Sequence, residues 1–182
     1  MYPYAVTPEQ LQLLANGVRD VPDFPKPGIL FRDITPILIN PDLFELSIQA
    51  LMEPIQRARI DKVVGIDARG FIFAAPTALH LEAGLVLVRK KGKHPWQTHA
   101  LAYSLEYGEA EVEIHVDSIH AGENVLLVDD LLATGGTAAA AQALIRRVGG
   151  NLIATAFLIE LADLGGRQRL AEDCPTYSIL QF

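Results

Sequence analysis

The chain has 182 residues, half of them hydrophobic, so we expect a globular protein with a single domain over residues 1–182. Acidic residues outnumber basic ones by 22 to 15, and the formal net charge of −7 argues against a nucleic-acid partner. The one cysteine, Cys174, cannot form an internal disulfide, and no stretch resembles a signal peptide or a membrane span. We therefore expect a cytoplasmic protein that has neither a membrane nor a nucleic acid as its partner.

The expected helices and strands alternate along the chain. Thr7, Pro8 and Gln10 have the pattern of a capping box, which predicts a helix start. A rigid proline-rich loop over residues 22–28 follows, and Asn40 predicts the start of a second helix. Further strands are predicted at residues 29–31, 63–66, 85–89, 102–107, 110–116, 125–128, 152–160 and 176–180, and further helices at residues 70–82, 138–148 and 165–172. This order predicts an α/β fold, with a parallel sheet flanked by helices and ligands bound beyond the carboxyl ends of the strands.

The most informative segment is residues 125–137. Its apolar start is typical of a strand buried on both faces, and Asp129 and Asp130 follow directly. A loop of small residues then leads into a predicted helix: Ala133, Thr134, Gly135, Gly136 and Thr137. Unpaired N–H groups at a helix start, with glycines that admit an anion, make a phosphate site, and the two carboxylates suit adjacent ribose hydroxyls. An ordinary strand–turn–helix corner would not explain the paired acids, and neither a Walker loop nor a GxGxxG fingerprint is present.

A second strand end has a similar order of residues. Asp67, Ala68 and Arg69 lie between the strand predicted at 63–66 and the helix predicted at 70–82. The planar guanidinium of Arg69 suits phosphate oxygens. Alone, such a pattern is more often a surface turn, but beside the first motif it predicts a pyrophosphate site.

A cationic cluster stands out in this acidic chain: Arg89, Lys90, Lys91 and Lys93. The alternatives are a solvated loop or a nucleic-acid patch, and the net charge weakens the second. Local positive charge would attract an anionic ligand and neutralise a departing pyrophosphate. Residues 90–102 are also expected to be long and irregular, as lids over active sites often are.

Residues 125–137 closely resemble the 5-phosphoribosyl diphosphate (PRPP) motif of the type I phosphoribosyltransferases. Residues 23–34, DFPKPGILFRDI, and residues 103–108, YSLEYG, resemble the adenine phosphoribosyltransferase branch of that family. The resemblance extends over nearly the whole chain. It implies the type I phosphoribosyltransferase fold, with a small N-terminal hood and a flexible hairpin lid. It also implies transfer of the 5-phosphoribosyl group from PRPP to adenine, which gives AMP and pyrophosphate in purine salvage.

The same resemblance implies a role for each candidate residue. The implied sites are adenine binding by Leu30, Phe31 and Arg32; ribose binding by Asp129 and Asp130; phosphate binding by Ala133, Thr134, Gly135, Gly136 and Thr137; and pyrophosphate binding by Asp67, Ala68, Arg69, Arg89, Lys90 and Lys93. Glu106 and Arg69 would be catalytic, and Glu106 would close the lid or manage the proton on adenine N7. Mg²⁺ would bind mainly through PRPP oxygens, without a metal site of the protein's own. Arg89 would reach pyrophosphate across a homodimer interface, and a cis peptide is expected in residues 67–69.

Two alternative functions remain open on the sequence. One is a phosphoribosyltransferase for guanine, xanthine or a pyrimidine, although a 6-oxopurine site would usually offer a lysine or another donor to the oxo group. The other is a non-catalytic regulator that senses PRPP, which we would expect to have an added nucleic-acid-binding region. His94 and Trp96 depart from the family pattern, and we expect them to affect lid closure rather than the reaction.

Overall fold

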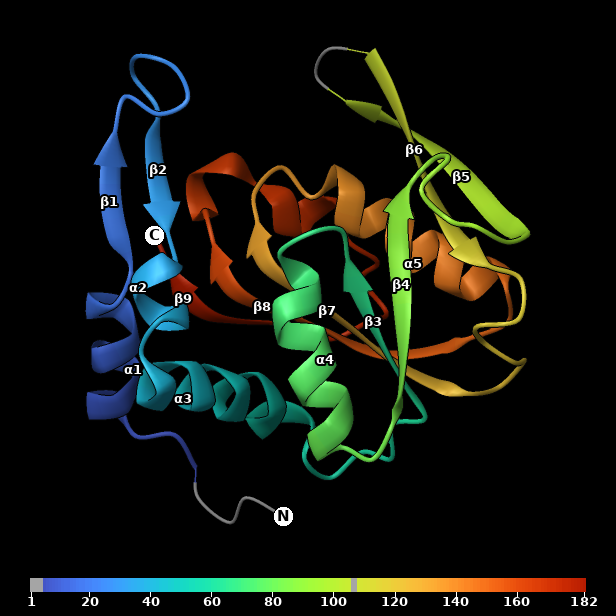
Figure 1. Ribbon diagram of the computed structural model, residues 1–182, viewed down its shortest axis with the longest axis horizontal. Helices are drawn as coiled ribbons and strands as arrows, with labels where there is room; N and C mark the ends of the chain where they lie inside the picture. The colour runs from blue at the N-terminus through green and yellow to red at the C-terminus, as the bar shows by residue number, and fades with distance from the viewer. Residues whose placement is uncertain (1–4, 106–107) are drawn as a thin grey trace. The chain divides into compact units, whose positions relative to one another are not determined.

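The computed structural model describes residues 5–105 and 108–182 (Figure 1), and the chain divides into two compact units. The N-terminal unit ends at Glu53, and the larger unit begins at Pro54. The expected single domain over residues 1–182 stays a prediction. In the described part of the chain, no helix combines the length and the apolar character that crossing a membrane requires.

The N-terminal unit begins with the capped helix that the sequence predicts. The side chains of Thr7 and Gln10 make both hydrogen bonds of the capping box. Asn40 caps the second predicted helix by accepting from two backbone N–H groups. The elements are α1 (Pro8–Asn16), β1 (Arg19–Pro22), β2 (Leu30–Asp33), α2 (Thr35–Leu38) and α3 (Pro41–Met52), with β1 and β2 paired antiparallel. The sequence pattern does not predict β1 and α2, because four residues are too few to establish a hydrophobic period.

The larger unit, among its described residues, forms a seven-stranded sheet in the order β5-β6-β4-β3-β7-β8-β9. The strands are β3 (Lys62–Ile66), β4 (Gly84–Lys90), β5 (Thr98–Leu105), β6 (Gly108–His115), β7 (Asn124–Leu132), β8 (Asn151–Glu160) and β9 (Thr176–Gln181). Neighbouring strands from β4 to β9 in this order are parallel, whereas β5 and β6 form an antiparallel hairpin beside β4. The sheet confirms the predicted α/β class and the predicted hairpin.

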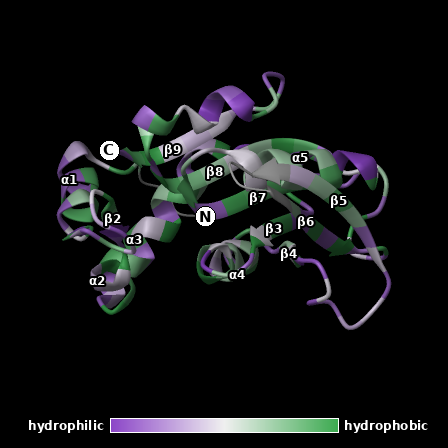
Figure 2. Ribbon diagram, turned by 90° about the horizontal axis from the view of Figure 1, so that it is seen from above, coloured by the Kyte–Doolittle hydropathy of each residue, from purple (hydrophilic) through white to green (hydrophobic). Residues whose placement is uncertain are grey.

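Helices α4 (Gly70–His80) and α5 (Gly136–Arg147) lie on opposite faces of this sheet (Figures 1 and 2). Helix α4 connects β3 to β4, whereas α5 connects β7 to β8 in the opposite direction along the sheet. Right-handed crossovers that run in opposite directions place their helices on opposite faces. The neighbours β3 and β7 therefore flank the point at which the connections diverge, and α/β sheets bind ligands at that point.

The central strands are buried on both faces, as their apolar sequences predict. Val63 and Val64 of β3 and residues 125–128 of β7 have no exposed surface. Helix α4 packs closely on β3, since a Cβ atom at Gly65 would lie 2.7 Å from the Cβ of Ala74. This close packing fixes the helix start beside the end of the strand.

Strand β7 is longer than the sequence predicts. It continues to Leu132, so Asp129 and Asp130 belong to the strand rather than to the following loop. The reason is its pairing: β3 pairs with β7 only as far as Val128, whereas β8 pairs with it as far as Leu132. The two acids therefore lie where one edge of β7 has lost its neighbour.

Two other predicted segments also differ. The irregular segment expected at residues 90–102 is shorter, because β4 includes Lys90 and β5 begins at Thr98. The short helix expected at residues 165–172 is shorter and of a different type, a 3₁₀ helix over Gly166–Arg169. Further 3₁₀ helices lie at Ala162–Leu164 and, after α3, at Glu53–Ile55.

Candidate active site

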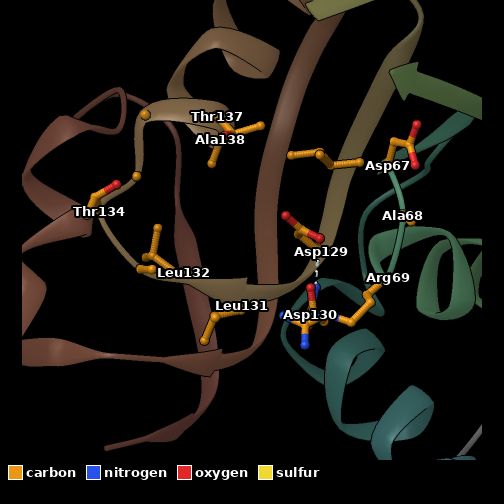
Figure 3. Close-up of a pocket in the computed structure, with 14 residues that line it drawn as sticks. Asp67, Ala68, Arg69, Asp129, Asp130, Leu131, Leu132, Thr134, Thr137 and Ala138 are labelled. Atoms are coloured by element: carbon orange, nitrogen blue, oxygen red, sulfur yellow. Dashed lines mark hydrogen bonds and ion pairs between the residues drawn. The ribbon is translucent and has the colours of Figure 1, made fainter. Parts of the chain in front are cut away.

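A cavity of about 260 Å³ lies at the carboxyl ends of β3 and β7 (Figure 3). Its lining comes from the turn between β3 and α4 and from the segment between β7 and α5. The lining residues are Ile66, Asp67, Ala68, Arg69, Asp129, Asp130, Leu131, Leu132, Ala133, Thr134, Gly135, Gly136, Thr137 and Ala138. The structure thus brings together the two motifs that the sequence singled out. Leu131 and Leu132 were not predicted as lining residues, because two leucines after a strand look like ordinary core residues.

Asp129 and Asp130 are adjacent in sequence but differ in their surroundings. Asp130 is only 5% exposed, and its Oδ2 atom lies 2.7 Å from Nε of Arg69. No hydrogen bond from the described residues reaches this oxygen, so the charge of Arg69 compensates it. Asp129 is half-buried and accepts a hydrogen bond at Oδ1 from the backbone N–H of Asp130 at 2.9 Å. Figure 3 shows the three side chains at one end of the cavity.

The environment makes this acid pair hard to ionise. Burial raises the pKa of Asp129 well above its ordinary value, and the charge of Asp130 raises it further. Burial also raises the pKa of Asp130, although the guanidinium of Arg69 opposes this change. A positive charge that enters or develops in the cavity would therefore be stabilised by the pair.

The loop after β3 has two special features of backbone geometry. The peptide bond between Asp67 and Ala68 is cis, as the family resemblance led us to expect. A Cβ atom at Gly70 would lie 2.6 Å from Oδ1 of Asp129. Only a glycine can start α4 so close to the acid pair, which explains the glycine after Arg69 in structural terms.

The loop before α5 has the geometry of an anion site. Gly135 caps the helix in the left-handed conformation, with φ of 79°. The first N–H groups of a helix have no partner within it, and here they begin at Gly136 beside the cavity. Thr134 and Thr137, which line the same cavity, can add hydroxyl donors.

A turn that contains Gly165 and Gly166 packs against the opposite side of this loop. A Cβ atom at Gly135 would lie 2.3 Å from the carbonyl oxygen of Gly166, and one at Gly166 would lie 2.1 Å from that of Ala133. Arg167 fixes the turn, because its Nε donates to Oε1 of Glu160 at 3.0 Å. This contact was not predicted, and the signal for it in the sequence is the pair of adjacent glycines, Gly165 and Gly166.

Part of the cationic cluster lies beside the loop after β3. Arg89 donates from Nε to Oδ2 of Asp67 at 3.3 Å and from Nη1 to the backbone oxygen of Lys93 at 2.7 Å. Lys90 is exposed at the end of β4. The pyrophosphate roles of these residues stay predictions, and Glu106 lies outside the described residues.

The three expected adenine-binding residues lie on β2 of the N-terminal unit. Arg32 forms an ion pair with Asp20, and the ring of Phe31 meets that of Phe24 edge-on with centroids 5.2 Å apart. Leu30 is 45% exposed. Their role in base binding also stays a prediction.

Comparison with known proteins adds independent information. Residues 37–179 match the family described as the phosphoribosyl transferase domain. The chain is 54% identical over 177 residues to the adenine phosphoribosyltransferase of Salmonella arizonae, and the match covers 97% of each chain. The chain belongs to the adenine phosphoribosyltransferase family. A second adenine phosphoribosyltransferase, from Azorhizobium caulinodans, is 52% identical over 170 residues, with 93% of this chain and 95% of that protein covered.

Solved structures of the adenine phosphoribosyltransferase family agree with this assignment. The enzyme from Rhodothermus marinus has a TM-score of 0.93 at 52% identity, and the match covers 97% of this chain and 100% of that one. The Saccharomyces cerevisiae enzyme, complexed with D-2,5-dideoxy-2,5-imino-altritol 1,6-bisphosphate and adenine, has a TM-score of 0.89 at 41% identity, with 95% and 99% covered. These matches confirm the predicted type I phosphoribosyltransferase fold.

Proposed function

We propose that the protein transfers the 5-phosphoribosyl group from PRPP to adenine and releases AMP and pyrophosphate, a reaction of purine salvage. The observation that supports this best is that one cavity joins the acid pair and phosphate loop after β7 with the Asp67–Arg69 loop after β3. A phosphate, a ribose and a pyrophosphate require three adjacent sites of this kind. The relatives at 52% and 54% identity have the same named activity.

The phosphate and the ribose of PRPP fit the segment after β7. The phosphate would accept hydrogen bonds from the start of α5 and from the hydroxyls of Thr134 and Thr137. Asp129 and Asp130 would accept hydrogen bonds from the two ribose hydroxyls. As the bond to pyrophosphate loosens, the ribose becomes oxocarbenium-like and positively charged. Burial and the charge of Asp130 raise the pKa of Asp129, Arg69 offsets only part of this change, and the developing charge on the ribose would offset more of it.

The leaving pyrophosphate fits the loop after β3. Arg69 already contacts Asp130, so its planar guanidinium would connect the ribose site with the pyrophosphate site. Arg89, which contacts Asp67 and Lys93, would bring positive charge to the same loop. Neutralising the departing charge in this way lowers the barrier to bond cleavage.

Adenine would bind through the Leu30 backbone and Arg32, with Phe31 near the ring. Its N9 atom would attack C1 of the ribose on the face opposite to the departing pyrophosphate, so both reactants need exact alignment. Glu106 would manage the proton on adenine N7. The adenine in the structure of the Saccharomyces cerevisiae relative supports this assignment of the base.

A magnesium ion fits this set of donors. The carboxylate oxygens of Asp129 and Asp130 suit a hard cation, although Oδ2 of Asp130 is already paired with Arg69. Mg²⁺ favours phosphate oxygens and retains several waters, so most of its ligands would be PRPP oxygens and water. When bound, Mg²⁺ would neutralise part of the pyrophosphate charge.

We also infer a homodimer in the cytoplasm. Leu79 at the end of α4 is 81% exposed, and Leu85 on β4 is 44% exposed. A partner subunit that covered them would remove apolar surface from water. The single cysteine, which is buried and unpaired, suits a reducing compartment.

An assay of base specificity tests the proposed function. The purified protein is mixed with PRPP, Mg²⁺ and one base at a time (adenine, hypoxanthine, guanine, xanthine or uracil), and nucleotides are separated by chromatography. We expect AMP from adenine at a rate at least about a hundredfold above that with any oxo base, because buried donors and acceptors would be mismatched. The Asp129→Asn variant, prepared identically, controls for contaminating enzymes. Equal turnover of hypoxanthine or guanine would contradict the assignment, and no nucleotide from any base would favour a PRPP-sensing regulator.

A further inference from the structure

Tyr103 on β5 makes a hydrogen bond to the predicted phosphate loop. Its hydroxyl oxygen lies 3.0 Å from Oγ1 of Thr137, in the first turn of α5. The body of Tyr103 packs against the hydrophobic core, which holds the hydroxyl in place. Thr137 lines the cavity, and Figure 3 shows it at the start of the helix. Thr137 therefore both contacts the tyrosine and lines the ligand site.

The direction of this hydrogen bond decides what Thr137 can offer a ligand. A threonine hydroxyl has one proton and two lone pairs. If Thr137 donated its proton to Tyr103, it would present only lone pairs to the cavity, and these repel phosphate oxygens. If Tyr103 donates instead, the single proton of Thr137 is available for the phosphate. Each hydrogen bond in such a chain polarises and strengthens the next.

We propose that Tyr103 is a positioning residue for the phosphate of PRPP. Its hydroxyl donates to Oγ1 of Thr137, so that Thr137 donates to a phosphate oxygen. The same bond ties the β5–β6 hairpin to the start of α5, two elements that also pack together. This inference rests on the proposed function of the loop as a phosphate site.

A double-mutant cycle with Thr137 tests the inference. Tyr103→Phe removes only the phenolic hydroxyl, and Thr137→Val removes only the hydroxyl of the threonine. We expect Tyr103→Phe to raise KM for PRPP by about threefold to tenfold with kcat and KM for adenine nearly unchanged, and Thr137→Val to raise it by about tenfold or more. The double variant should match Thr137→Val alone, because a hydroxyl that acts through Thr137 has no effect once that group is gone.

Binding of product fragments provides a second measurement. Calorimetry should show that Tyr103→Phe weakens binding of ribose 5-phosphate by the same factor and leaves binding of pyrophosphate unchanged. A general loosening of the fold would weaken both. Tyr177→Phe, on β9 and away from the cavity lining, is the matched control and should behave as wild type.

The outcomes separate the inference from the proposed function. If Thr137→Val leaves KM for PRPP unchanged, the loop does not hold the phosphate through Thr137, and the proposed site itself is wrong. If Thr137→Val raises KM but Tyr103→Phe does not, the positioning role of Tyr103 is overturned while the phosphate site stands. If the increases in KM for PRPP from the two substitutions multiply in the double variant, the positioning role of Tyr103 is also overturned.

Discussion

Arg69 and Asp130 join the two loops that line the cavity, with Nε of the first 2.7 Å from Oδ2 of the second. The carboxylate side of this pair is almost fully buried, whereas 39% of the Arg69 side chain is exposed. Burial and the charge of Asp130 raise the pKa of the neighbouring Asp129 well above its ordinary value, and they outweigh Arg69, which lowers that pKa. The two neighbouring acids should therefore respond differently to the same substitution.

The first prediction compares Asp129→Asn with Asp130→Asn. Because the folded protein holds a proton on Asp129 more tightly than the unfolded chain, this group costs stability as the pH rises above its ordinary pKa of 3.8. Asp129→Asn should remove that cost and raise Tm at pH 7, while kcat falls by about a hundredfold or more. Asp130→Asn should also lower kcat but should raise Tm by less, because burial raises the pKa of Asp130 too, while its ion pair with Arg69 opposes that change. Calorimetry from pH 4 to 8 with steady-state kinetics measures both effects, and identical Tm shifts would contradict the asymmetry.

The second prediction concerns the glycine that supports the phosphate loop. In Gly166→Ala the new methyl group would lie 2.1 Å from the Ala133 oxygen, so the loop must move. We expect KM for PRPP to rise by about tenfold or more, with a loss of stability of about 1–3 kcal/mol. Gly84→Ala is the matched control, because its methyl group would meet only the flexible side chain of Lys62. An unchanged KM in Gly166→Ala would show that this contact does not shape the site.

The third prediction is that the stability of the protein depends on pH through His94. Burial lowers the pKa of His94 from its ordinary 6.5. The His115 ring, whose centroid lies 4.2 Å from that of His94, lowers this pKa further. Arg89 also lowers it, whereas Glu113 raises it. Below pH 6.5 the unfolded chain then binds more protons than the folded one, so stability falls as the pH falls towards the folded-state pKa. Thermal unfolding of His94→Asn should show a smaller decrease over this range.

His120→Asn, which changes an exposed histidine, is the control for the pH dependence. It should retain the slope of the wild type. The same slope in His94→Asn and wild type would assign the effect to other groups.

The fourth prediction is closure of the β5–β6 hairpin over the substrates. An oxocarbenium-like ribose would react with water if it were not covered. Amide exchange in residues 91–105 should therefore slow when PRPP and Mg²⁺ bind. Glu106→Leu should lower kcat by about a hundredfold or more and leave PRPP binding nearly unchanged. Glu106→Gln separates the charge from the size of the side chain. Equal exchange with and without ligand would exclude the lid.

The fifth prediction is a homodimer that depends on the exposed leucines of α4 and β4. Leu79→Glu combined with Leu85→Glu should shift the sedimentation coefficient from dimer to monomer and reduce activity, because charged groups would be buried at the interface. Leu164→Glu, at a position 51% exposed, is the control and should remain dimeric. A fully active monomeric wild type would refute the prediction.

Much of the fold follows from local sequence patterns. The capping box of Thr7 and Gln10 and the cap at Asn40 predict helix starts correctly, because each is satisfied within a few residues. The apolar run of residues 125–128, followed by two acids and a glycine loop, predicts a buried strand that leads into an anion site. The four-residue elements β1 and α2 escaped prediction, because four residues are too few to establish a hydrophobic period.

Only the tertiary structure decided which strands are neighbours. The sequence shows that β3 and β7 are buried, but burial does not reveal that they pair and so place Asp67 and Asp129 around one cavity. The ion pair of Arg69 with Asp130, the support of Ala133 by Gly166 and the bond from Tyr103 to Thr137 likewise join residues far apart in the chain. Hydrophobic periodicity reflects which residues within a short segment share one face of a helix or strand. It has no information about distant partners, and those contacts create the different environments of the two acids.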